Sequence, residues 1–186
     1  GSEEVASEAI SAGVTDYLQK ETGVERYELL ANRICNAVRR TRAEQKAAEL
    51  ERVTEVVRQI NRTLVRATSR EQIERAVCET LRDSEPYRFA YVGRYDPEAE
   101  TVEPTAWAGF EAGYLDDIAV TAAQEPKGRG PGGRAIRTRE VAVVQDVTDD
   151  PSFEPWRESA LERGYRAVAG VPLVYRDELY GLLGVY

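Results

Sequence analysis

Two adjoining stretches of the chain decide its fold: GPGGRAIRTREVAVVQDVTDDPSF at residues 130–153 and RGYRAVAGVPLVYRDELYGLLGVY at residues 163–186. In the first stretch, glycines precede a short helical pattern, and the apolar run at residues 141–147 predicts a strand. In the second stretch, apolar runs at residues 167–175 and 179–186 flank a polar turn, which predicts a hairpin.

Further elements are predicted on both sides of these strands. An alternating run from Tyr87 to Tyr95 closes at Asp96-Pro97 and predicts a strand, and residues 101–108 are its expected hairpin partner. Ser69 can cap a helix that ends near residues 84–86. A short helix is expected over residues 154–163. We therefore predict an α+β fold in which helices flank an antiparallel sheet.

A long helix is predicted ahead of this sheet, because residues 26–67 contain neither proline nor glycine. In its second half, apolar residues recur at spacings of three and four: Leu50, Val53, Val57, Ile60, Leu64 and Ala67. A narrow stripe of this kind is buried when two helices pack as a coiled coil, so the first five residues predict a homodimer interface. The alternative is an amphipathic helix that lies on its own domain, since fewer than four heptads are sustained.

Length and composition limit the classes of protein that the chain can form. With 186 residues, 42% of them hydrophobic, it can bury one full core or one core with a helical appendage. Its apolar runs are far shorter than the ~20 residues of a membrane-spanning helix, so we expect no membrane segment. The formal charge of -8 argues against direct binding of nucleic acid.

Location and source are indicated by the cysteines and the charged residues. Cys35 and Cys78 have no metal-ligand spacing, and no secretion signal is recognised at the N-terminus, so we expect a cytoplasmic protein. Lys20, Lys46 and Lys127 are the only lysines, whereas Arg, Asp and Glu are abundant. This bias is typical of halophilic archaea, although a GC-rich genome would also favour Arg over Lys.

Taken in order, the elements of residues 50–186 resemble a GAF domain. The resemblance rests on the glycine-rich entry to a helix, the strand that ends in Asp146, and the Val-Pro-Leu strand at residues 171–173 paired with a glycine-containing one. It implies a small-molecule or signal-sensing module, dimeric through its N-terminal helix. The identity of the ligand is not implied, because one fold hosts many functions. We assign the GAF domain to residues 69–186 and a linker or signalling helix to residues 41–68.

Residues 1–40 resemble the last third of a response-regulator receiver domain, through the segment AGVTDYLQKETG at residues 12–23 and the helix that follows. Lys20 occupies the position of the receiver lysine that senses the phosphoryl group, whereas Glu21 replaces the usual proline. Together with the GAF domain, this resembles haloarchaeal regulators of the bacterio-opsin activator type. The resemblance implies a two-component system and an output helix-turn-helix domain in a longer protein.

Aromatic residues supply the candidate ligand site. The resemblance places Trp107, Phe110, Tyr114, Phe153 and Trp156 along the cavity between sheet and helices, with Asp146 at a strand end nearby. Large rings around a few polar groups suit a small organic ligand. Arg134 and neighbouring basic residues predict that this ligand is neutral or anionic, and that it contacts Trp107 and Trp156. The alternative is that the rings only fill the core. The module would then serve as a structural dimerisation and relay unit without a ligand.

Catalytic, metal and cofactor chemistry find little support in the residues. The chain has no histidine, and Cys35 and Cys78 fall on predicted helices, so we expect no enzyme and no catalytic residue. Gly128, Gly130 and Gly133 spell GxGxxG but lack the context of a dinucleotide site, and we expect a flexible loop over a pocket, with anion binding as the alternative. Asp149-Asp150 is a weak metal candidate, and we predict neither a metal nor a cofactor.

Overall fold

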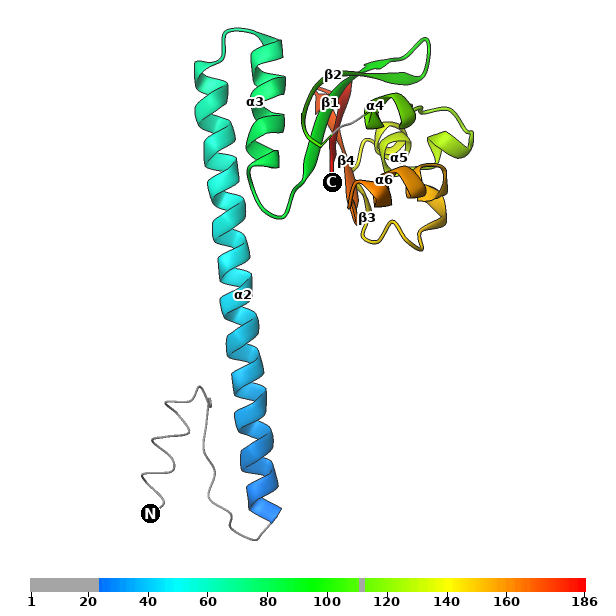
Figure 1. Ribbon diagram of the computed structural model, residues 1–186. Coiled ribbons are helices and arrows are strands. Elements are labelled where there is room, and N and C mark those ends of the chain that lie inside the picture. The colour runs from blue at the N-terminus through cyan, green and yellow to red at the C-terminus, as the bar shows by residue number, and fades with distance from the viewer. Residues whose placement is uncertain (1–23, 111–112) are drawn as a thin grey trace. The chain divides into compact units, whose positions relative to one another are not determined.

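The computed structural model describes residues 24–110 and 113–186. Along the chain, one compact unit ends at Thr54 and a second begins at Glu55. The first described element is helix α2, which runs from Val24 to Arg66 (Figure 1). It forms as predicted because no proline or glycine interrupts it. The segment at residues 12–23 that suggested a receiver domain lies outside the described residues.

The second unit is built on a five-stranded antiparallel sheet with the strand order β2-β1-β5-β4-β3. The predicted α+β fold with a long N-terminal helix is thus confirmed. The strands are β1 (Phe89–Asp96), β2 (Thr101–Gly109), β3 (Ala142–Val144), β4 (Val168–Tyr175) and β5 (Glu178–Val185). The two predicted hairpins, β1-β2 and β4-β5, are joined through the pairing of β1 with β5.

Helices cover both faces of the sheet (Figure 1). Helix α3 (Arg70–Arg82) packs on one face, where Cys78 and Leu81 meet small apolar residues of the strands. The opposite face carries α4 (Tyr114–Asp117), η1 (Pro126–Gly128), α5 (Pro131–Thr138), η2 (Pro151–Trp156) and α6 (Arg157–Glu162). Residues 89–93 of β1 are all buried, because this strand is covered on both faces.

Element boundaries differ most from the sequence prediction at two places. The strand predicted over residues 141–147 is only Ala142–Val144, since it pairs with β4 alone and the chain turns at Asp146, whose carboxylate accepts a hydrogen bond from the Thr148 amide. The helix predicted from Glu154 begins as an α-helix at Arg157, after the 3-10 turn η2 that contains Pro155. Proline has no amide hydrogen to donate within a helix, which favours the irregular first turn.

The cap of α3 and the seam on α2 can be compared directly with their predictions. The Ser69 Oγ accepts a hydrogen bond from the Gln72 amide at 3.3 Å, as predicted for the start of α3. On α2, Leu50, Val53, Val57 and Leu64 are between 40% and 59% exposed, whereas Ile60 is half-buried. Val56, one position from the seam, packs on the cluster beneath α3. The end of α2 therefore contacts its own domain on one side and leaves most of the predicted seam exposed.

The two cysteines should differ in reactivity. Cys78 is fully buried and burial raises the pKa of its thiol to about 12, so the reactive thiolate is absent at pH 8, whereas Cys35 is exposed. We expect a thiol reagent such as DTNB to modify one cysteine per native chain and two after denaturation. In a Cys35→Ser variant, native modification should vanish; rapid modification of that variant would contradict the buried position of Cys78.

Candidate ligand site

A layer of aromatic rings lies on the face of the sheet opposite α3. The ring centroids of Phe89 and Tyr165 are 5.6 Å apart, those of Tyr114 and Tyr165 are 5.3 Å apart, and those of Tyr165 and Tyr186 are 5.1 Å apart. Burial raises the pKa of Tyr91, Tyr114 and Tyr186 above the ordinary tyrosine value, so these phenols stay protonated at neutral pH. Rings at these distances in edge-on and offset geometry stabilise the core.

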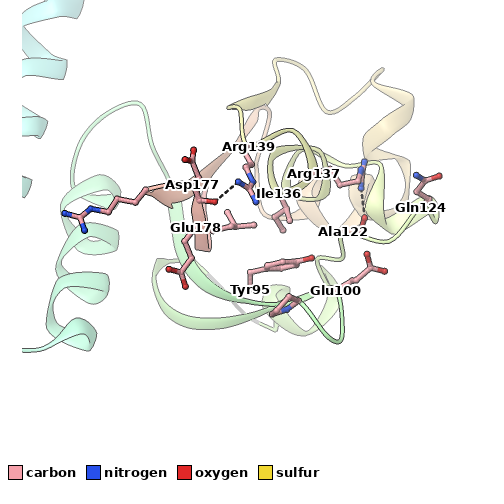
Figure 2. A pocket seen from close by; sticks show the side chains of 12 residues that line it. Tyr95, Glu100, Ala122, Gln124, Ile136, Arg137, Arg139, Asp177 and Glu178 are labelled. Atoms are coloured by element: carbon pink, nitrogen blue, oxygen red, sulfur yellow. Dashed lines mark hydrogen bonds between the residues drawn. The ribbon is translucent and has the colours of Figure 1, made fainter.

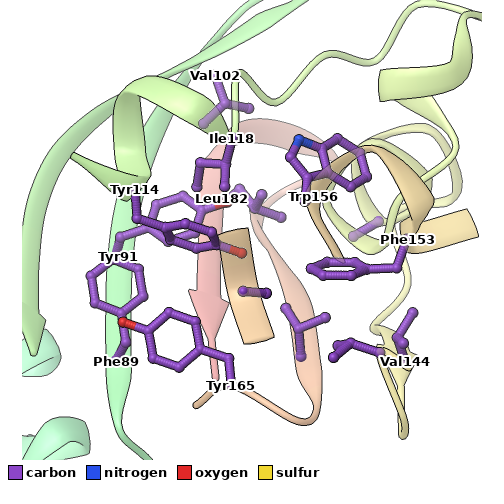
Figure 3. Packing of buried hydrophobic residues seen from close by; sticks show 14 of the residues in the cluster. Phe89, Tyr91, Val102, Tyr114, Ile118, Val144, Phe153, Trp156, Tyr165 and Leu182 are labelled. Atoms are coloured by element: carbon purple, nitrogen blue, oxygen red, sulfur yellow. The ribbon is translucent and has the colours of Figure 1, made fainter. Parts of the chain in front are cut away.

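A second, smaller aromatic group closes the same face near α5. Figure 3 shows Phe153 and Trp156 on one side of the core and the rings of Phe89, Tyr91, Tyr114 and Tyr165 gathered on the other. The rings of Phe153 and Trp156 are 5.5 Å apart, and both residues are buried. Both come from η2, the 3-10 turn that crosses beside the first turn of α5.

A cavity of about 20 Å³ remains between this group and the sheet. Its walls come from the centre of the sheet, from η1 and α5, and from η2, and include Tyr91, Gly184, Lys127, Phe153 and Trp156. A volume of ~15 Å³ by this measure holds one water molecule. The space between Trp156 and the sheet is therefore about the size of a single water.

Two residues of the cavity lining carry hydrogen-bond donors, Trp156 and Lys127. The indole Nε1 of Trp156 is buried and has no hydrogen-bond partner among the described residues. Lys127 is the charged residue of the lining. A buried donor without a partner costs about 1–3 kcal/mol, so an acceptor atom in the cavity would be stabilised there.

The predicted site residues do not form one site. Phe153 and Trp156 line the cavity, and Tyr114 lies beside it within the aromatic layer. Trp107 and Phe110 are 50% and 63% exposed, because the edge strand β2 lies beyond β1 and outside the area that α5 and η2 cover. Trp156 lines the cavity, whereas Trp107 does not line it and only pairs with the cavity residue Tyr91. That one ligand contacts both tryptophans stays a prediction.

The two predicted polar residues also lie away from the cavity lining. The Nη2 atom of Arg134 donates to the carbonyl oxygen of Val143 at 3.1 Å. Asp146 accepts hydrogen bonds from the amide and the hydroxyl of Thr148, which lowers the pKa of its carboxyl group. These contacts hold the turn after β3. Sequence reasoning passed over Tyr91 and Gly184, although the strand alternation and the hairpin pattern identify both as central positions of the sheet.

The glycine-rich segment is tightly packed and is not the flexible loop that we expected. A Cβ on Gly133 would lie 2.3 Å from the carbonyl oxygen of Gly128 and 2.4 Å from that of Thr121. A Cβ on Gly130 would lie 2.4 Å from the indole ring of Trp156. The missing side chains thus let the backbone at Gly133 approach two carbonyl oxygens and the backbone at Gly130 approach the Trp156 ring. These contacts explain the glycines of the GxGxxG pattern without a bound phosphate.

The acidic pair Asp149-Asp150 serves a structural turn. The Asp150 carboxylate accepts hydrogen bonds from the amide and hydroxyl of Ser152 at 2.8 and 2.6 Å, which caps η2 and lowers the pKa of Asp150. In the part of the chain that the structure describes, no group of three or more Asp, Glu, Cys or His side chains could hold a metal ion. No described helix combines the length and apolarity needed to cross a membrane.

Comparison with known proteins agrees with this architecture. The profile of the GAF domain family matches residues 67–186. The chain belongs to the GAF domain family. It is also 29% identical over 145 residues to the bacterioopsin transcriptional activator of Halobacterium salinarum, a match that covers 73% of this chain. The match covers only 19% of that regulator, so the chain spans about a fifth of its length.

Solved GAF structures share the fold at low identity. The GAF domain of a phosphoenolpyruvate-protein phosphotransferase from Coxiella burnetii superposes with a TM-score of 0.56 at 19% identity, covering 71% of this chain and 75% of that one. The fRMsr of Staphylococcus aureus, determined in complex with its substrate, gives a TM-score of 0.54 at 15% identity, covering 71% of this chain and 76% of that one. The similarity establishes the fold and leaves the function to be argued from the residues.

The packing of the glycine-rich segment predicts different outcomes at neighbouring positions. Gly133→Ala should reduce the free energy of unfolding by about 2 kcal/mol, because the added Cβ meets two backbone oxygens that cannot move independently. At Gly132 the nearest atoms are the ends of the Val120 and Leu182 side chains. Gly132→Ala should therefore reduce the free energy of unfolding by less than Gly133→Ala does. Part of this loss is offset by the ~1 kcal/mol by which alanine is favoured over glycine in a helix. Denaturant titration measures both, and equal losses would refute this account.

Proposed function

We propose that this GAF domain is the signal-sensing domain of a transcription regulator and has no catalytic activity. The distant similarity to a transcriptional activator supports the regulatory role. The residues support the absence of catalysis: the chain has no histidine, and the Cys78 thiol is buried with its pKa raised to about 12. A two-component system, a halophilic archaeal source, a cytoplasmic location and a helix-turn-helix output domain are parts of the same proposal.

The ligand that we propose is a small neutral or anionic molecule bound between the sheet and the segment from Gly128 to Trp156. The observation that carries the proposal is the buried indole donor of Trp156, which lacks a partner beside a cavity lined by Lys127. Both groups favour an acceptor atom, and a cation would be repelled by Lys127. A molecule larger than water has to displace the Trp156 ring, which lies against Gly130, so ligand binding is expected to move η2.

Indole fluorescence can report this movement, because Trp107 and Trp156 are the two tryptophans of the chain. We expect small molecules released from protein purified out of its own cells, identified by mass spectrometry, to change the fluorescence of Trp107→Phe, in which Trp156 is the reporter. The half-exposed Trp107 pairs with the cavity residue Tyr91 but does not itself line the cavity, so the matched variant Trp156→Phe should respond more weakly. A response carried equally by both variants would place the ligand elsewhere.

A relay module without a ligand is the second candidate function, and the small size of the cavity favours it. If the aromatic residues simply fill this face, the domain would transmit a conformational change from a preceding domain to the output domain. Purified protein would then release no small molecule. The fluorescence of Trp107→Phe would also stay constant in the low-molecular-mass fraction of a cell extract.

Both functions require a dimer, which we propose to form through the seam Leu50, Val53, Val57, Ile60 and Leu64. The four residues other than Ile60 are at least 40% exposed, and an apolar stripe of this length is unfavourable in water. Ile60 is half-buried on the side of α2 that bears Val56, so it lies at the border between seam and domain.

Light scattering with one substitution on the seam and one beside it tests this interface. Val57→Glu should convert the dimer to a monomer at micromolar concentration, because a buried carboxylate at the seam is costly. Val65 is 87% exposed on the same helix and lies off the seam, so Val65→Glu adds the same charge and should leave the dimer intact. A native chain that is monomeric in high salt would rule out the coiled coil.

A further inference from the structure

A second and much larger pocket opens at the other end of α5. Its volume is about 740 Å³, within the range of ~300–1,000 Å³ that is common for small-molecule sites. It lies between the C-terminal end of α5, the turn of the β1-β2 hairpin and the turn of the β4-β5 hairpin, and it shares no lining residue with the cavity at Trp156. Figure 2 shows the ring of Tyr95 beneath Ile136 at the base of this pocket. Nothing in the proposed sensing function uses it.

Two arginines beside the pocket are held in position by backbone oxygens. The Nη1 atom of Arg137 donates to the carbonyl oxygens of Ala122 at 2.9 Å and Gly128 at 2.7 Å. The Nη1 atom of Arg139 donates to the carbonyl oxygen of Asp177 at 2.6 Å (Figure 2). Neither guanidinium forms an ion pair with a carboxylate of the described residues. Both positive charges are therefore fixed in place with donor atoms still free for an anion.

The backbone around the pocket adopts an unfavourable conformation at four charged residues. The described non-glycine residues with positive φ are Glu100, Arg139, Arg176 and Asp177, at 53°, 59°, 49° and 63°, and all four line this pocket. Glycine or asparagine would adopt this conformation at lower cost, and such costs persist mainly where a side chain has a task. The hairpin turn and the helix end thus carry arginines where the backbone alone would favour glycine.

We propose that this pocket binds an organic carboxylate with an apolar body. The carboxylate is held by the guanidinium group of Arg139, and the body lies on Tyr95, Ile136 and Leu179, which are pocket residues with apolar surface.

The acidic residues of the same lining limit the charge of the ligand. Glu100, Asp177 and Glu178 also border the pocket, so its formal charge with Arg137, Arg139 and Arg176 is close to zero. A dianion such as a phosphate monoester meets these carboxylates at close range, whereas a monoanion is held by Arg139. A hydroxyl or amino group on the far side of the ligand would find an acceptor in Glu100.

Benzoate and its neutral analogue benzamide test the pocket on the full chain by ligand-observed NMR. We expect saturable binding of benzoate at least ~10-fold tighter than that of benzamide, since a charge-assisted hydrogen bond contributes more than a neutral one. 2-Naphthoate should bind more tightly than benzoate, because its second ring covers more of the apolar base. Absence of saturable binding by both acids, or equal binding of benzamide, would overturn the proposal.

Asparagine substitutions separate a specific site from general attraction to positive charge. Arg139→Asn keeps a residue that tolerates the left-handed conformation, so the melting temperature should hold while benzoate affinity falls at least ~10-fold. The matched control is Arg176→Asn, which removes the same charge from the same pocket rim at another left-handed position. The Arg176 guanidinium lies over the Tyr175 ring, 5.1 Å from its centroid, so its loss should weaken benzoate less than ~3-fold. Equal losses in the two variants would contradict the site.

Failure of this test leaves the sensing proposal intact, because the two sites share no residue. Benzoate binding should also leave the fluorescence of Trp107→Phe unchanged, since Trp156 is not part of this pocket. A fluorescence change carried by Trp156 would instead assign benzoate to the buried cavity and refute its placement at Arg139.

Discussion

The close approach of α5 to the sheet is the constraint on which the rest of this structure depends. A Cβ on Gly170 of β4 would lie 2.8 Å from the carbonyl oxygen of Pro131, so glycine is what lets the helix backbone rest directly on the strand. Gly133 serves the same purpose on the other side of the helix, against Thr121 and Gly128. With α5 fixed in this way, the elements that flank it, η1 and η2, have little room to be placed differently.

Both cavities follow from the position of this one short helix. At its first turn, Trp156 covers Gly130 and the space above the sheet shrinks to about 20 Å³. At its last turn, Arg139 takes a left-handed conformation before the chain enters β3, and the pocket of about 740 Å³ lies beside this helix end. The first space is enclosed by rings with few polar groups, whereas the second is open and lined by charges of both signs. The small cavity and the large pocket differ in chemistry because η2 covers the former, whereas hairpin turns border the latter.

The opposite face of the sheet connects the core to the long helix. Cys78 and Leu81 of α3 pack on the strands, and Val56 of α2 packs on the same cluster, while Val57 beside it stays exposed. The same turn of α2 thus packs on the domain core through Val56 and carries the exposed seam residue Val57. A change in core packing would therefore reach this turn of α2 through a single layer of side chains.

The sequence by itself determined the long helix, the helix capped by Ser69 and the two hairpins, because the alternation from Tyr87 to Tyr95, the two hairpin patterns and the proline-free helix are local signals. The pairings of β1 with β5 and of β3 with β4 came from the tertiary structure. The resemblance to a GAF domain pointed to Phe153 and Trp156, which line the small cavity. Only the tertiary structure decided that Trp107 is half-exposed and does not line this cavity, since the strand order places β2 at an edge of the sheet. It likewise decided that the glycines serve packing and that Arg137 and Arg139 face a separate pocket. The carbonyl oxygens that hold these arginines come from residues as distant in the chain as Ala122 and Asp177, and no local pattern encodes such contacts.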